Sequence, residues 1–166
     1  RAAKDGNGWR LAGRKAVVLH GAQADKIVVS ARTSGAAGEE NGISLFVLDK
    51  GAKGLAVRDY RTIDGLRAAD LTLDDVQVGA DALLGGEGKA AAAVDQVMDL
   101  GAAALCAEGV GVMETLGAQT LEYIKARQQF GQPIGRFQVN QHKAADIFIH
   151  TEQSKSMAYH LIRTPG

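Results

Sequence analysis

The sequence predicts an α+β protein. We expect an antiparallel β-barrel or sandwich over residues 1–84, followed over residues 85–166 by a long antiparallel α-helical hairpin that is part of a helical bundle. In the first half, short apolar runs bounded by turn residues recur about every ten residues, which is typical of antiparallel sheets. From about residue 87 the apolar residues recur at helical spacing, and no proline occurs before Pro133.

The expected strands, in chain order, are residues 9–11, 16–19, 25–32, 42–49, 55–60 and 71–78. We interpret Gly13 as a turn between the first two strands. The polar loop 33–41 is expected to be an exposed hairpin tip between the third and fourth strands. In the last strand the apolar alternation breaks after Leu73, which is typical of a β-bulge.

Two long helices are expected next, over about residues 87–127 and 139–162. The first would have about 40 residues and a length of roughly 60 Å. Gly101, Gly109 and Gly117 fall inside its pattern and indicate close packing against other helices. Two helices joined by a short turn cannot cover both of their apolar faces, so we expect further helices or another chain to pack on them.

The composition narrows the function classes. Nineteen Lys and Arg balance nineteen Asp and Glu, which argues against nucleic acid or anionic membranes as partners. No uninterrupted apolar run approaches the roughly 20 residues of a membrane span, so none is expected. The single Cys106 rules out an internal disulfide and favours a reducing compartment, so we expect a cytoplasmic location. The four His residues show no metal-ligand spacing, and no metal site is expected.

The segment between the two expected helices contains a cation, aromatic rings and several amides, whereas a plain helix connection needs only a few residues with a glycine. Residues 127–146, "RQQFGQPIGRFQVNQHKAAD", resemble the pattern R-x-Q-F-G-x-P-I-x-x-F-Q-x-x-Q-x-x-x-A-D of the acyl-CoA dehydrogenase family. Upstream, "GRKAVVLHGAQAD", "GISLFVLD", "DDVQV" and "LLGGEG" resemble landmarks of that family in the same order. The resemblance implies the family's middle β-domain over residues 1–84 and the first two helices of its C-terminal helical domain over residues 85–166.

The resemblance also implies an activity and a site. The family uses FAD to desaturate an acyl-CoA thioester in fatty acid metabolism, acts as a homo- or hetero-oligomer, and in most members passes electrons to an electron-transfer flavoprotein. Arg127 is expected to reach the FAD pyrophosphate of a neighbouring subunit, since a guanidinium contacts phosphate in a bidentate way. Phe130 is expected beside the adenosine and Gln138 to hydrogen-bond to it, with Gln129 as a weaker candidate. The alternative from the residues alone is a capped turn with Phe130 and Phe137 buried.

Other positions depart from the family pattern. Val17 and Leu19 stand where the family has a Trp that packs on the flavin and a hydroxyl residue that meets its polar edge, so both are expected at the cofactor. Ala102 replaces an Arg near the acyl-CoA, and Asp99 remains as a candidate for lining the substrate cavity. Gly101 replaces the carboxylate base of a minority of members, and no catalytic residue is expected in this chain.

These departures leave three interpretations open. The chain is an incomplete part of an active enzyme, whose base lies elsewhere. Alternatively, it is a catalytically degenerate subunit that pairs with a complete one, similar to the small subunits of two-subunit dehydrogenases such as the pimeloyl-CoA type. The third interpretation is a flavin-free scaffold. In each of them, residues 1–166 alone are expected to catalyse nothing.

Overall fold

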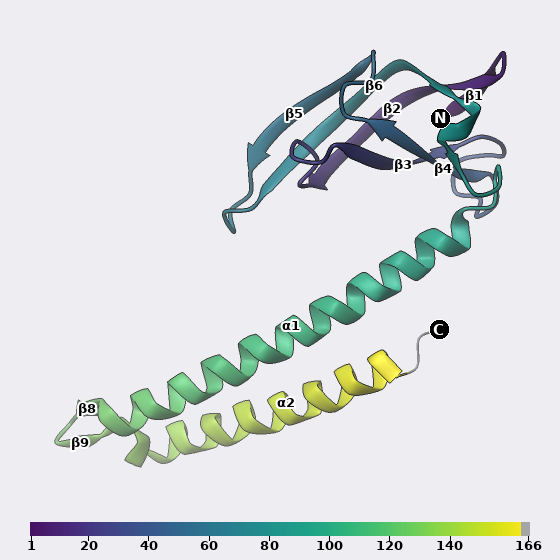
Figure 1. The fold of residues 1–166 in the computed structure, drawn as a ribbon. Coiled ribbons are helices and arrows are strands. Elements are labelled where there is room, and N and C mark those ends of the chain that lie inside the picture. Colours follow the sequence, from purple (N-terminus) through teal and green to yellow (C-terminus); the bar gives the residue numbers. More distant parts are fainter. Residues whose placement is uncertain (164–166) are drawn as a thin grey trace. The chain divides into compact units, whose positions relative to one another are not determined.

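In the computed structural model of the chain, residues 1–163 are described, and they contain antiparallel sheets and two long helices (Figure 1). The expected α+β class is therefore confirmed. By its internal contacts the chain divides into two compact units, with the division after Val94. The predicted domain boundary after residue 84 stays a prediction.

The first unit has two antiparallel sheets. The larger has the strand order β1 (Ala2–Asp5), β2 (Gly8–Leu19), β6 (Arg67–Gly79) and β5 (Leu55–Arg61). The smaller has the order β3 (Lys26–Arg32), β4 (Ile43–Asp49) and β7 (Leu83–Leu84). The expected barrel is not closed, because within residues 1–163 no strand pairs across the two sheets and β3 pairs with β4 alone.

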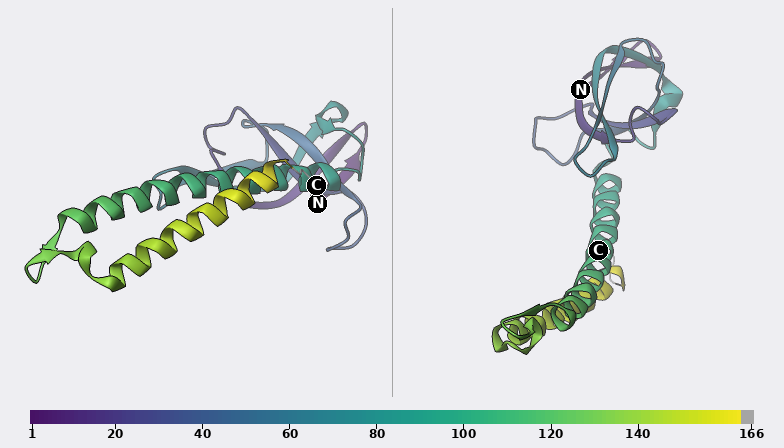
Figure 2. Two further views of the ribbon diagram at one scale, coloured as in Figure 1. Left: turned by 90° about the horizontal axis from the view of Figure 1, so that it is seen from below. Right: turned by 90° about the vertical axis from the view of Figure 1, so that its left-hand side faces the viewer.

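The two sheets face each other across one shared core, as the end-on view in Figure 2 shows. The alternating pattern of β3 and β4 turns every second residue inward, which is why these strands bury Val29, Phe46 and Leu48. Trp9 of β2 packs edge-on against Phe46, with ring centroids 5.4 Å apart. Each large apolar side chain buried this way contributes about 1.5–3 kcal/mol to folding. The side chains that are almost completely buried are Leu11, Phe46, Leu48, Leu71 and Val76.

The pairing of β2 with β6 corrects one expectation and confirms another. Gly13 is not a turn, because β2 runs straight through it and Gly13 pairs with Leu73. Between this pair and the next, Leu11 with Val76, β6 has one residue more than β2. The bulge expected after Leu73 is therefore confirmed, and Asp75 has a positive φ of 50° there.

The helical hairpin is confirmed. After a short 3₁₀ turn η1 (Ala80–Ala82), α1 runs over Ala91–Ala126 and α2 over Gln138–Arg163, and both figures show them antiparallel and side by side (Figures 1 and 2). Lys155 on α2 joins them, with its Nζ 2.5 Å from Oε1 of Glu114 on α1 and 3.0 Å from Oε1 of Glu152. Gly117 brings the backbone of α1 close to Ile147 of α2.

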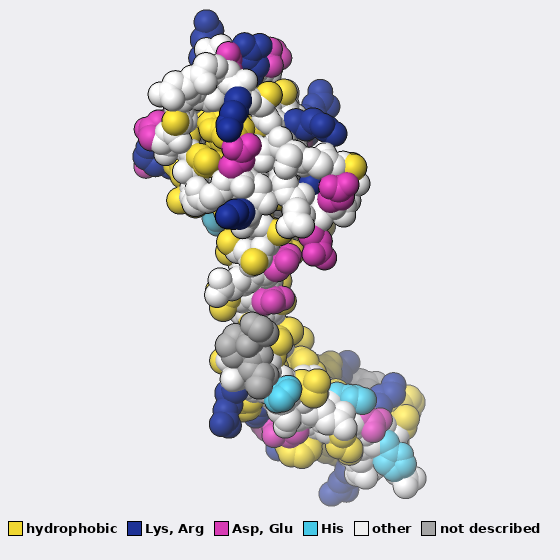
Figure 3. Space-filling model, turned by 90° about the vertical axis from the view of Figure 1, so that its right-hand side faces the viewer, with side chains coloured by type: hydrophobic (Ala, Val, Ile, Leu, Met, Phe, Trp, Pro, Cys, Tyr) yellow, Lys and Arg dark blue, Asp and Glu magenta, His cyan; other side chains and the backbone are white. Residues whose placement is uncertain are grey.

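Much of the apolar surface of the helices is exposed in the described residues, and hydrophobic side chains are spread over the helical part in Figure 3. Within α1 no residue is buried. One 18-residue window of α1 has a mean hydropathy of 1.2, so its length and composition would suffice for a membrane span. An interior helix of a soluble bundle has the same composition. The expectation that no segment spans a membrane therefore stays a prediction. Exposed large side chains of α1 include Val97, Met98, Leu100, Leu105, Val112 and Leu116.

Candidate functional site

The first candidate region is the α1–α2 connector, residues 127–138. Arg127 begins it directly after the last residue of α1. Its backbone is fixed on both sides: its N–H donates to Tyr123 O at 2.8 Å, and its carbonyl accepts the N–H of Ile134 at 2.8 Å. The guanidinium is exposed and takes part in no ion pair or hydrogen bond within residues 1–163. The fold thus holds the backbone of Arg127 and leaves its cation available.

A short β-hairpin follows Arg127. Strand β8 (Gln128–Gln129) pairs with β9 (Gln132–Pro133), and the two loop residues, Phe130 and Gly131, have φ angles of 56° and 78°. Two positive φ angles define a type I′ turn, in which Asn or Gly is preferred at the first position. A bulky residue there costs of order 1–2 kcal/mol. The Phe130 side chain therefore occupies a position where local conformation disfavours it.

The ring of Phe130 projects from this hairpin and is 91% exposed. Its recorded ring contact is an edge-on one to Phe137, with centroids 6.1 Å apart. The alternative expectation, in which both rings are buried in a capped turn, is therefore wrong for Phe130. The hairpin lifts this ring out of the helical unit, because the turn residues lie at its tip.

The second half of the connector is held by hydrogen bonds from α2 and lies close to α1. The 3₁₀ turn η2 (Ile134–Arg136) lies against α1, and a Cβ at Gly135 would stand 3.0 Å from Ile124 O. The amide of Asn140 donates to Ile134 O at 2.8 Å, and that of Gln141 donates to Gly135 O at 3.1 Å. The carbonyl of Ile134 also accepts the backbone N–H of Phe137 at 3.2 Å, so side chains of α2 add to the bonds of the turn itself. Gln138, the first residue of α2, stays exposed.

The connector therefore brings together four of the residues expected to bind cofactor: Arg127, Gln129, Phe130 and Gln138. All four are exposed, and the described residues form no side-chain hydrogen bond with Gln129 or Gln138. A cation, an aromatic ring and two amides suit a ligand that combines phosphate with a flat heterocycle. The adenosine-diphosphate half of FAD is such a ligand, so these residues fit it.

The second candidate region is the end of β2. Pairing moves from Lys15↔Leu71 to Val18↔Ala69, so β2 has one residue more than β6 and forms a bulge. Val17 in this bulge has a φ of 53°, which is rare for a β-branched residue. The side chains of Val17 and Leu19 are 59% and 60% exposed. The structure therefore presents both at the surface, as a cofactor contact requires.

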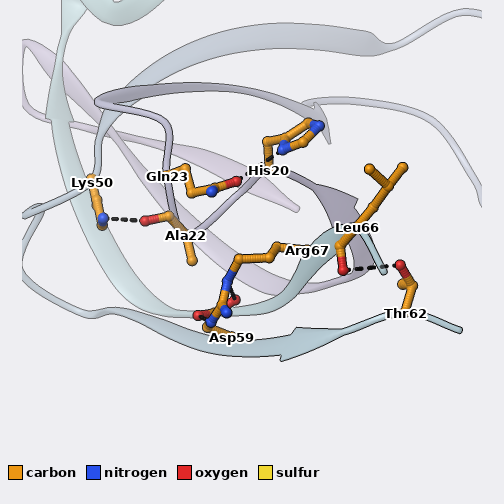
Figure 4. A network of polar contacts seen from close by, with 8 residues as sticks. All are labelled: His20, Ala22, Gln23, Lys50, Asp59, Thr62, Leu66 and Arg67. Carbon is orange, nitrogen blue, oxygen red and sulfur yellow. Dashed lines mark hydrogen bonds and ion pairs between the residues drawn. The ribbon is translucent and has the colours of Figure 1, made fainter. Parts of the chain in front are cut away.

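The residues that follow this end of β2 form polar contacts with one another and with other parts of the β unit (Figure 4). The N–H of His20 donates to Arg67 O at 2.9 Å, and His20 Nδ1 is hydrogen-bonded to Gln23 Oε1 at 2.8 Å. Arg67 forms an ion pair with Asp59 of β5. Asp70, a residue that the sequence patterns did not single out, accepts the N–H of Val17. The signal in the sequence that could have indicated Asp70 is a charged residue between two apolar ones, Ala69 and Leu71, which the structure buries.

Asp99 lies on α1 far from the connector. It is exposed, as are Gly101 and Ala102. Its distance from the end of α1 at Ala126 is about 40 Å, at 1.5 Å per residue. The structure therefore does not bring Asp99 together with the connector residues of the same chain.

Residues 1–76 match the family model of the acyl-CoA dehydrogenase middle domain, and residues 88–165 match that of the acyl-CoA dehydrogenase C-terminal domain. The chain belongs to the acyl-CoA dehydrogenase family. Its members are oxidoreductases, and FAD is typical of them.

Individual relatives agree with this assignment. The mitochondrial isovaleryl-CoA dehydrogenase of Oryza sativa subsp. japonica is 32% identical over 98% of this chain and 40% of its own length. The solved butyryl-CoA dehydrogenase of Megasphaera elsdenii is 31% identical, with a TM-score of 0.86 over 96% of this chain and 42% of that one. The FAD complex of PigA is 30% identical, with a TM-score of 0.89 over the same shares. The chain thus spans less than half the length of these relatives.

Proposed function

We propose that this chain is part of an FAD-dependent enzyme that introduces a double bond between the α and β carbons of an acyl-CoA thioester. The observation that supports this most is the connector, which gathers an exposed ring with an exposed cation and two exposed amides, and the cation and amides form no side-chain hydrogen bond or ion pair with the described residues. FAD, when bound, supplies the hydride acceptor for such a reaction. The protein's part is to bind, orient and exclude water.

Within this proposal the connector holds the adenosine-diphosphate half of the cofactor. Arg127 contacts the pyrophosphate, because its planar guanidinium can donate two parallel hydrogen bonds to phosphate oxygens. Phe130 packs beside the adenosine, and Gln138 hydrogen-bonds to it, with Gln129 as a weaker contributor. The strained turn at Phe130 supports a role outside the helical unit, since the ring gains little by burial within it.

Val17 and Leu19 contact the flavin ring in this proposal, and Asp99 lines the acyl-CoA cavity. Val17 and Leu19 offer aliphatic surface, without an indole or a hydroxyl. The separation of about 40 Å along α1 between Asp99 and Ala126 supports a site shared between subunits of a homo- or hetero-oligomer. An electron-transfer flavoprotein is the proposed acceptor, and the cytoplasm is the proposed location.

A second candidate function is that of a degenerate partner subunit. Gly101 and Ala102 stand where members of the family have a carboxylate or an arginine, and Val17 stands where they have an indole. We therefore assign no catalytic residue to this chain. A flavin-free scaffold remains the third candidate.

A visible absorption spectrum of the full-length gene product, before and after addition of acyl-CoA thioesters without oxygen, tests all three. The proposed function predicts a flavin band that bleaches on addition. A band that never bleaches would favour the degenerate subunit, whose complete partner should then restore bleaching. A colourless protein would leave only the scaffold.

A further inference from the structure

The bulge at Val17 leaves one backbone group without a partner in the sheet. Because β2 has an additional residue between Lys15 and Val18, the N–H of Val17 has no carbonyl of β6 to meet. An unpaired N–H costs free energy comparable to a lost hydrogen bond. A positive φ at a β-branched residue adds to that cost. Something must therefore hold this bulge in place.

Asp70 supplies the missing acceptor. It lies on β6 between Ala69 and Leu71, directly opposite the bulge, and its Oδ1 accepts the N–H of Val17 at 3.2 Å. This hydrogen bond, followed by that from Tyr60, lowers the pKa of the Asp70 carboxyl below its ordinary value. The carboxylate is therefore ionised at neutral pH, when it is the stronger acceptor.

Residues of β5 orient the carboxylate from the other side. The hydroxyl of Tyr60 donates to Oδ1 at 3.0 Å, and the guanidinium of Arg58 donates to Oδ2 at 3.3 Å. Arg58 also stacks over the Tyr60 ring, 5.7 Å from its centroid. Asp70 thus connects β5 to the bulge across β6, and its rotamer is set by groups that do not belong to the bulge.

We infer that Asp70 is a positioning residue for the flavin-contacting end of β2. Through the N–H of Val17 it fixes the bulge, and the bulge sets where the side chains of Val17 and Leu19 stand. This inference rests on the proposed function, since it takes the flavin ring as what those two side chains contact. Asp70 itself touches neither cofactor nor substrate in this scheme.

The test uses the full-length holoprotein and three variants. Asp70→Ala removes the acceptor, whereas Asp70→Asn keeps an oxygen for Val17 and Tyr60. Asp5→Ala is a matched control, because Asp5 is also an ion-paired carboxylate of the same sheet, on β1 away from the bulge, with a side chain 41% exposed against 37% for Asp70. Two quantities are measured: the visible circular dichroism of bound flavin, and hydrogen exchange of the Val17 amide.

For Asp70→Ala we expect an altered flavin dichroism and exchange of the Val17 amide about tenfold faster or more, because its hydrogen bond to a charged group is lost. Asp70→Asn, whose amide oxygen is a weaker acceptor than a carboxylate, should change both readouts less than Asp70→Ala does, and Asp5→Ala should match the parent. The inference is overturned if Asp70→Ala matches the parent, or if Asp5→Ala changes both readouts as much. If the unsubstituted protein binds no flavin, the proposed function is overturned, and with it the contact of Val17 and Leu19 with the flavin ring. Hydrogen exchange of the Val17 amide would still show whether Asp70 holds the bulge.

Discussion

The N–H of Val17 donates to Oδ1 of Asp70 at 3.2 Å, so a carboxylate on β6 fixes an irregular turn of the backbone on β2. The same oxygen accepts the hydroxyl of Tyr60 on β5. Three strands therefore meet at one ionised side chain. The protonation state of Asp70 links the shape of the bulge to pH.

This linkage predicts how stability changes in acid. The folded-state pKa of Asp70 lies below its ordinary value of 3.8, so its contribution to stability is present above that value and is lost as pH falls through the lower, folded-state pKa. Asp70→Asn should therefore be less stable than the parent at pH 6, and the difference should shrink at about pH 2.5. Urea unfolding at both pH values measures it. A difference that is equal at both would contradict the assignment.

Arg127→Ala should weaken retention of FAD more than it harms folding. Loss of hydrogen bonds to a charged partner costs about 1.5–3 kcal/mol, a factor of roughly 10 to 100 in affinity. Because the guanidinium of Arg127 forms no ion pair or hydrogen bond within the described residues, the melting temperature of the flavin-free protein should barely change. Flavin-to-protein ratio after dialysis is the measurement. Arg136→Ala is the control, since Arg136 is an exposed cation of the same connector. Equal losses in both variants would point to general charge attraction.

Phe130→Asn should separate stability from cofactor binding. Asn is favoured at a positive φ, so the turn should gain up to about 1 kcal/mol in the flavin-free protein. The same change removes the ring proposed to pack beside adenosine, and flavin retention should fall. Thermal unfolding with and without added FAD shows both effects. Unchanged flavin retention in Phe130→Asn would remove this residue from the site.

Two glycines of the helical unit should respond to alanine in opposite ways. A Cβ at Gly117 would meet Ile147 Cγ2 at 3.5 Å, an ordinary contact, so Gly117→Ala should stabilise α1 by about 1 kcal/mol. A Cβ at Gly135 would stand 3.0 Å from the carbonyl oxygen of Ile124, so Gly135→Ala should destabilise by about 1–3 kcal/mol. Chemical denaturation compares the two variants. Stabilisation by Gly135→Ala would show that α1 packs less tightly against η2, and destabilisation by Gly117→Ala would show that α1 and α2 pack more tightly at Ile147.

Strand and helix periods were enough to predict the α+β class and the helical hairpin, because each element has a continuous pattern. They were not enough at Gly13, where glycine suggested a turn but an antiparallel ladder with β6 continues through it. Closure of the barrel depends on which strand edges pair across the two sheets. No single segment carries that information.

In the candidate site, too, some residues could be predicted from the sequence and others could not. The connector could be predicted from the sequence because its residues are contiguous and resemble a family pattern. Asp70 could not, because its role depends on a bulge in another strand that only the register of β2 and β6 reveals. The positive φ of Phe130 could not be predicted either, since it is set by the hairpin register rather than by the preference of a phenylalanine.

The central claim is that the connector binds the adenosine-diphosphate half of FAD. Affinities of the flavin-stripped full-length protein for FAD and for FMN, which lacks the adenosine monophosphate part, test it most directly. We predict that FAD binds at least about tenfold more tightly than FMN, and that Arg127→Ala removes most of this difference. Equal affinities for FAD and FMN, or a preference that Arg127→Ala leaves intact, would contradict it.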